Sequence, residues 1–174
     1  MKRVALVLFA IVLIGSIATA QMAKSGAWGV TGNFQVATSP QVPTQDAGFK
    51  FMVSDNLAIH IGVGLTSYTP SGGSASTGYD FNAGIQYYME SKGGNVAPFI
   101  GASIGYGGAS LAGGATASTM LAVTGWFGGE YFFSPNFSWG GAAGLGFVSS
   151  GPSGATSTGI GTGQVAMLLT WYVN

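Results

Sequence analysis

The amino-acid sequence predicts an all-β protein: an eight-stranded antiparallel up-and-down transmembrane β-barrel, preceded by a cleavable signal peptide. Three observations predict this fold. The chain begins with an apolar segment that ends in a cleavage site, the rest of it carries very little charge, and it alternates apolar with small or polar residues over segments of roughly ten residues. A chain with these features is expected to be secreted and to cross a membrane with strands.

The N-terminal segment has the three parts of a secretory signal peptide. Lys2 and Arg3 supply the positive charge, residues 4–14 form an unbroken apolar run, and residues 18–20 read Ala-Thr-Ala, a small-residue cleavage site. The alternative is an uncleaved anchor, but the apolar run is short for the roughly 20 residues that a spanning helix needs. We therefore expect residues 1–20 to be removed and residues 21–174 to form one outer-membrane barrel domain.

Charge is scarce in the remaining chain. The sequence has five basic and five acidic side chains, and Lys2 and Arg3 belong to the signal segment, so eight charged side chains remain. Soluble domains carry about 25% charged residues, whereas this chain has 6%. No second apolar run is long enough for a spanning helix, and only a closed barrel then satisfies the backbone inside a membrane. A formal net charge of zero removes the basis for nucleic-acid binding, and the absence of cysteine excludes disulfides and thiolate metal sites.

Eight segments show the period of two that indicates β-strands. In each segment one parity is apolar and the other is small or polar, and residues rich in Gly, Ser, Thr and Pro separate the segments. The predicted strands are 26–38, 45–54, 57–68, 78–89, 96–107, 118–133, 137–149 and 161–174.

The alternation leaves two directions open. A soluble barrel of the lipocalin kind would turn the apolar parity inward, but its exterior would need more charge than the polar parity offers. The connectors favour the opposite direction, because short periplasmic turns alternate with longer external loops in outer-membrane barrels. The expected long connectors are 39–44, 69–77, 108–117 and 150–160, and the short ones are 55–56, 90–95 and 134–136.

Aromatic residues of the apolar parity fall at two levels of the predicted barrel. Such rings mark the two interfaces of a membrane. The level at the short turns comprises Trp28, Tyr87, Tyr131, Trp139 and Trp171, and the level at the long loops comprises Tyr79, Tyr106 and Phe147.

Two glycine-rich stretches carry a resemblance to a known family. Residues 98–107 read PFIGASIGYG, and residues 128–133 read GGEYFF and lead into Ser138. Over residues 25–174 the chain resembles the OmpA/OmpX-like outer-membrane β-barrel domain family. The resemblance implies a Gram-negative outer membrane, with its lipid and lipopolysaccharide as surroundings, insertion by the barrel-assembly machinery, and a monomer. The family usually ends on an aromatic residue, whereas this chain ends Trp-Tyr-Val-Asn, which leaves the register of the last strand open.

Strand parity also predicts a polar network in the lumen. It places Lys50, His60, Asp80, Gln86 and Glu130 inside the barrel. Counted from the short turns, Lys50 and Glu130 lie at the same height on strands that face each other across the barrel. Because charges in a low-dielectric interior need partners, we expect these two to form an ion pair. The pair would either gate a narrow pore or belong to a structural plug.

We expect no catalytic residue, no metal site and no cofactor. His60 is the only histidine of the chain and lacks partners at ligand spacing or a nucleophile within reach. The protein is therefore expected to be a non-catalytic envelope protein with a structural or surface-interaction role.

Inward glycines leave the state of the lumen open. Glycine at such positions allows either walls that touch or a cavity partly filled by larger side chains. The glycines are Gly62, Gly64, Gly101, Gly105, Gly140, Gly144 and Gly146, and the larger side chains are Tyr68, Tyr88, Trp126 and Phe132. The alternative function is therefore a narrow, porin-like pore or a conduit for small solutes or small apolar molecules. Four loops rich in Gly, Ser and Thr, including residues 71–74, 113–114 and 151–154, would face the outside.

Overall fold

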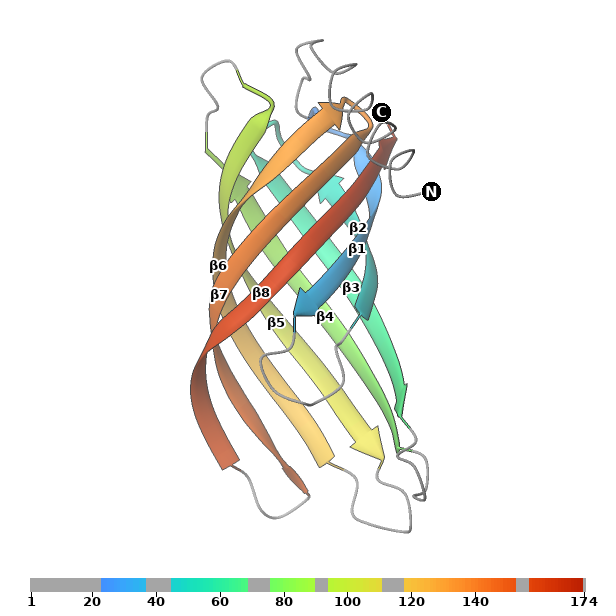
Figure 1. Cartoon of the computed structure of the whole chain (residues 1–174), viewed down its shortest axis with the longest axis vertical. Coiled ribbons are helices and arrows are strands. Elements are labelled where there is room, and N and C mark those ends of the chain that lie inside the picture. The colour runs from blue at the N-terminus through green and yellow to red at the C-terminus, as the bar shows by residue number, and fades with distance from the viewer. Residues whose placement is uncertain are drawn as a thin grey trace, which may run out of the picture.

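The protein folds into one closed barrel of eight antiparallel strands, each hydrogen-bonded to its neighbours in sequence (Figure 1). The computed structural model describes residues 23–36, 45–68, 76–89, 94–110, 118–152 and 157–173, so the predicted signal peptide lies outside the described residues. The strands are β1 (Trp28–Val36), β2 (Gln45–Met52), β3 (Leu57–Tyr68), β4 (Ser76–Tyr88), β5 (Val96–Ser110), β6 (Ser118–Ser134), β7 (Phe137–Pro152) and β8 (Ser157–Val173). In this part of the chain no helix is long and apolar enough to cross a membrane.

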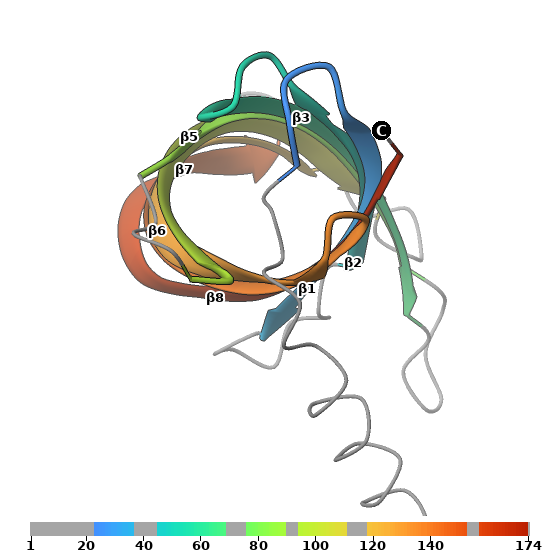
Figure 2. The ribbon, with the colours of Figure 1, turned by 90° about the horizontal axis from the view of Figure 1, so that it is seen from above.

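The first and last strands close the barrel. Trp28 lies opposite Val173 and Val36 lies opposite Val165, with every residue between them paired. This pairing fixes the register that the C-terminal residues left open, and the unusual C-terminus does not prevent the last strand from pairing along the whole of β1. Viewed from above, the strands form a complete ring (Figure 2). Closure leaves the sheet without an open edge, which is the condition for strands to cross a lipid bilayer.

The strands on the long-loop side extend further than the sequence predicted. β5 continues to Ser110, β7 continues to Pro152 and β8 begins at Ser157, so the expected connectors 108–117 and 150–160 were too long. These residues are mainly Gly, Ser and Ala, which have little strand preference of their own. They pair because a neighbouring strand continues beside them, as context governs strand formation more than intrinsic preference does.

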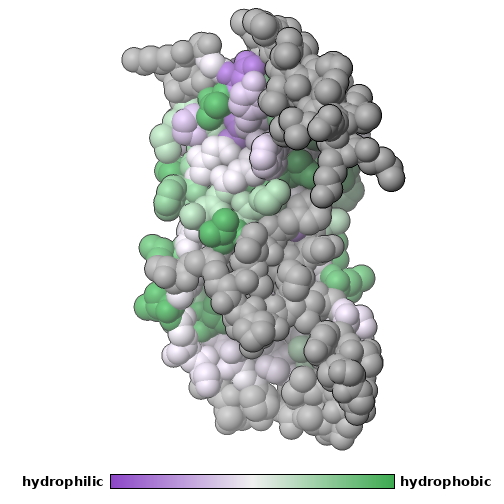
Figure 3. Space-filling model, in the orientation of Figure 1, coloured by the Kyte–Doolittle hydropathy of each residue, from purple (hydrophilic) through white to green (hydrophobic). Residues whose placement is uncertain are grey.

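The apolar parity faces outward, as predicted. Ile61 and Phe127 are 58% and 66% exposed, although they belong to central parts of their strands. Figure 3 shows hydrophobic patches at both sides of the visible face, and the most hydrophilic residues lie near the upper end. In water such an exterior would be unstable, whereas in lipid it is matched to its surroundings. The fold and this exterior define a transmembrane barrel.

The two ends of the barrel differ. We call the upper end in Figure 1, where the even-numbered strands finish, the turn end, and the opposite end the loop end. Segments 53–56 and 135–136 connect strands at the turn end. Segments 37–44, 69–75, 111–117 and 153–156 connect them at the loop end and lie outside the described residues. The wall is also uneven, because β1 and β2 have 9 and 8 residues whereas β6 and β8 have 17 each.

Candidate functional site: the barrel lumen

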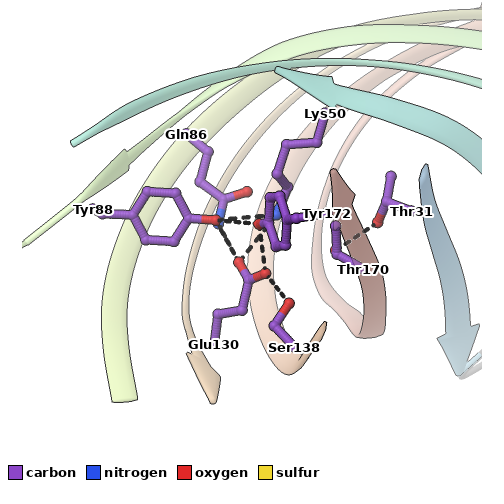
Figure 4. A network of polar contacts seen from close by, with 8 residues as sticks. All are labelled: Thr31, Lys50, Gln86, Tyr88, Glu130, Ser138, Thr170 and Tyr172. Carbon is purple, nitrogen blue, oxygen red and sulfur yellow. Dashed lines mark hydrogen bonds and ion pairs between the residues drawn. The ribbon is translucent and has the colours of Figure 1, made fainter. Parts of the chain in front are cut away.

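Glu130 is the centre of a buried polar network near the turn end (Figure 4). Its strand, β6, alternates regularly, and this alternation directs Phe132 and Glu130 inward while Tyr131 points outward. Glu130 has no exposed surface. A carboxylate in this position is stable only if other groups satisfy both of its oxygens.

Lys50 of β2 supplies the opposite charge. Its Nζ lies 3.0 Å from Oε2 of Glu130 and 3.1 Å from the hydroxyl of Tyr88, and the lysine side chain is 2% exposed. The ammonium also lies 5.7 and 5.9 Å from the ring centres of Tyr88 and Tyr172, within the range of cation–π attraction. Lys50 and Glu130 therefore form a buried ion pair whose positive member is enclosed by aromatic rings.

Three hydroxyl groups complete the carboxylate's surroundings. Tyr88 of β4 donates to Oε2, while Ser138 of β7 and Tyr172 of β8 donate to Oε1. The Tyr172 bond measures 2.8 Å, and the two tyrosine hydroxyls lie 3.4 Å apart. Gln86 of β4 reaches Oε2 more weakly, at 3.5 Å. Charge-assisted bonds of this kind are the strong ones in proteins. The network thus joins five strands through one carboxylate.

A compact apolar layer fills the lumen between this network and the turn end. Its rings are in contact, with 6.0 Å between the centres of Tyr88 and Phe99 and 5.9 Å between those of Phe132 and Tyr172. The buried side chains of this layer are Ala23, Ala27, Met52, Ala58, Tyr88, Ala97, Phe99, Phe132 and Tyr172. Together with the ion pair they form the turn-end plug.

The segment before β1 extends the plug. The amide of Gly26 donates to the carbonyl of Met52 at 2.8 Å, and Gly26 adopts a positive φ of 87° that glycine allows without strain. The amide of Ser25 donates to Asp55 Oδ1 at 2.9 Å. These bonds hold Ala23 and Ala27 against the turn end, where they are 2% and 3% exposed.

A cavity of about 200 Å³ lies in the lumen on the loop-end side of the network. Lys50 and Gln86 line it at the plug, and His60, Asp80 and Trp126 line it farther along the wall. The rings of His60 and Trp126 contact each other with centres 5.2 Å apart. The lumen therefore has a filled half and a hollow half.

The five polar residues that the sequence placed in the lumen lie in two separate places. Lys50, Gln86 and Glu130 come together, whereas His60 and Asp80 line the cavity instead. Sequence reasoning did not single out Ser138 and Tyr172 as partners of Glu130. Both have the inward parity of their strands, and Tyr172 follows inward Thr170 by two positions, so parity was the signal that could have found them.

The aromatic residues predicted for the two interfaces all lie on the outward face. Six of the eight are 43–50% exposed, Trp171 is 60% exposed, and Tyr131 is partly exposed. At the turn end the ring contacts extend further, from Tyr131 to Phe133 (4.9 Å), from Phe133 to Phe137 (5.7 Å) and from Phe137 to Trp171 (6.0 Å). An irregularity in pairing between Phe132 and Ser134 places the extra residue, Phe133, in this row.

Comparison with known proteins supports the fold. No known family model matches the sequence, and no curated protein matches it. The barrel is similar in structure to OprG from Pseudomonas aeruginosa, an outer membrane protein (TM-score 0.57, 13% identity, 89% of this chain and 99% of OprG). It is also similar to the N-terminal β-barrel domain of OprF from Pseudomonas aeruginosa (TM-score 0.56, 10% identity, 86% and 98%). A third similar structure is the outer membrane protein AlkL (TM-score 0.52, 13% identity, 90% and 94%). The fold is that of the small outer-membrane β-barrels.

Within the described ranges no group of three or more His, Cys, Asp or Glu side chains is placed to hold a metal ion. The described lumen residues provide hydrogen bonding and charge pairing at the plug, and apolar surface with a few polar groups in the cavity.

Proposed function

We propose that this protein is a non-catalytic integral barrel of the outer membrane whose lumen does not conduct ions. The filled turn end supports this proposal, with a buried 3.0 Å ion pair between Lys50 and Glu130 and an apolar layer behind it. Eight-stranded barrels have interiors just wide enough for side chains to fill. The ion pair is then part of a structural plug rather than a gate, and the role is to anchor in the membrane and expose the loop end for surface interaction.

Membrane residence is tested by fractionation and gel migration. We expect the protein in the outer-membrane fraction. We also expect its gel migration to change on boiling, because a closed barrel resists detergent until heat breaks its hydrogen bonds. Release into the soluble fraction after osmotic shock, without such a shift in migration, would contradict the proposal.

Conductance of the purified protein in planar bilayers tests the plug. We expect no discrete current steps from the wild type or from Lys50→Ala, since Tyr88, Phe99 and Phe132 still fill the turn end in that variant. Trp126→Ala is the comparison variant, because Trp126 lines the cavity and packs against the apolar layer without belonging to it. Steady channels in the wild type that change with Lys50→Ala would instead establish the gated pore.

The cavity favours a second candidate function, the handling of small solutes or small apolar molecules. Passage through the full length of the lumen would require the turn-end plug to move. Entry into the hollow half does not require this.

A further inference from the structure

The cavity has the size of a small-molecule site. Its volume is about 200 Å³, and a buried apolar cavity of about 150 Å³ is large enough to bind benzene. Lys50 and Gln86 close it toward the plug. Lys50 is paired with Glu130, and Gln86 donates weakly to the same carboxylate, at 3.5 Å. The cavity is therefore a pocket with one closed end.

Small residues on one strand and large rings on the next build the pocket wall. A Cβ at Gly101 would lie 2.5 Å from the Trp126 ring, and one at Gly84 would lie 2.6 Å from the His60 ring. These two rings are thus seated against neighbouring backbone, where glycine alone leaves room. Ala122, Ala142, Ala166 and Leu168 add apolar wall. The shape depends on packed side chains, as expected of a formed pocket.

One polar atom at the pocket lacks a partner. The Oδ1 atom of Asn33 is buried and accepts no hydrogen bond from the described residues. Asn33 belongs to the residues that line the cavity, and its backbone pairs with Leu168 of β8. A buried acceptor without a donor is costly and rare. A rotation of the side chain of Asn33 would turn Oδ1 toward the cavity, where a ligand with a hydroxyl or amide N–H would satisfy it.

We propose that the loop-end cavity is a closed-ended binding pocket for a small, mostly apolar molecule that carries one hydrogen-bond donor, such as a short aromatic or aliphatic alcohol. The apolar body lies against Trp126 and the alanine wall, and the donor bonds to Oδ1 of Asn33. This inference goes beyond the proposed anchoring role, because binding requires neither passage through the barrel nor a surface partner.

The pocket is tested with benzyl alcohol and with toluene, which has the same ring but no donor. Trp28, Trp139 and Trp171 face outward and are replaced by Phe, so that Trp126 is the only remaining reporter. We expect a saturable change in Trp126 emission, with benzyl alcohol binding about threefold to tenfold more tightly than toluene, the range that one neutral hydrogen bond provides.

Two leucine substitutions distinguish binding in the pocket from partitioning of the probe molecules into the detergent or lipid. Gly105 lines the cavity, and a Cβ there would meet no heavy atom closer than 3.6 Å, so Gly105→Leu fills the pocket. Gly125 is exposed on the outward face, where a Cβ would meet nothing closer than 4.0 Å, so Gly125→Leu is the matched control. Saturable binding should be lost in the first and kept in the second.

Asn33→Leu tests the donor requirement without filling the cavity to the same extent, and it should reduce the affinity for benzyl alcohol to that for toluene. It also keeps the proposal testable if Gly105→Leu does not fold, which its heat-dependent gel migration reveals. A linear, unsaturable response shared by all variants would overturn the pocket, and equal affinity of the wild type for both probes would overturn the role of Asn33. Neither result would bear on membrane residence or on the proposed lack of conductance, which the fractionation and bilayer experiments test separately.

Discussion

The turn end and the loop end of the lumen are built from the same alternating strands, yet one is filled and the other is hollow. Near the turn end the inward positions carry Tyr88, Phe99, Glu130, Phe132 and Tyr172, all fully or almost fully buried. Toward the loop end the inward positions of the same strands carry mainly glycine, alanine and short polar residues. Because the barrel's width is set by strand number and tilt, side-chain size alone determines whether a stretch of lumen is a core or a cavity.

The largest expected effect is at the turn end, where removing one partner leaves an unpaired buried charge. Glu130→Ala is expected to lower the free energy of unfolding by about 3–5 kcal/mol, measured by urea denaturation of the barrel in lipid vesicles. The double variant Lys50→Met/Glu130→Gln removes both charges and keeps an acceptor for Ser138 and Tyr172, so it should recover more than half of that loss. If Glu130→Ala were as stable as the wild type, the turn end would not depend on its ion pair.

A smaller effect is expected where the two regions meet. Gly101→Ala would place a Cβ 2.7 Å from the carbonyl oxygen of Ile85 as well as against Trp126, so backbone must shift. The expected cost is roughly 1–3 kcal/mol. Gly105→Ala, in the hollow half, has a clearance of 3.6 Å and should change stability by less than about 0.5 kcal/mol. Equal losses in the two variants would mean that both halves are equally close-packed.

The smallest effect concerns a single neutral hydrogen bond. Thr170 donates to the hydroxyl of Thr31 at 3.2 Å, across the β1–β8 closure. Thr31→Val should cost about 0.5–1.5 kcal/mol in the same unfolding measurement. Adding Thr170→Val should cost little more, because both changes remove one bond. Fully additive losses would show that the two hydroxyls act separately.

Much of this arrangement could be predicted from parity. A period of two is enough to define which side chains share a face. Counting residues from the short turns then placed Lys50 and Glu130 at the same height in the barrel. The strand ends at the loop side were harder to predict, since Ser110 and Pro152 pair only because β4 and β6 continue beside them.

The sequence could not distinguish inward glycines that contact a ring from those that border a cavity, and the reason is physical. Whether an inward glycine seats a neighbouring ring or borders open space depends on the register and tilt of the next strand. Gly101 and Gly105 lie on the same face of β5, yet the first lies against Trp126 and the second borders the cavity. Sequence parity treats the two positions as equivalent.

The carboxylate of Glu130 also constrains the order of events when the barrel opens or assembles. Its partners Tyr88 and Tyr172 are each 42 residues away along the chain, on opposite sides of it, and Lys50 is 80 residues away. None of these three contacts can stabilise a single hairpin, because each needs strands that are far apart in sequence to come together first. Only the bond from Ser138, 8 residues away, can form within the β6–β7 hairpin, so the network is complete only when distant strands have come together. We therefore expect assembly to be slow in its late steps and opening to be all-or-none, with the whole circle of strands released together rather than one hairpin at a time.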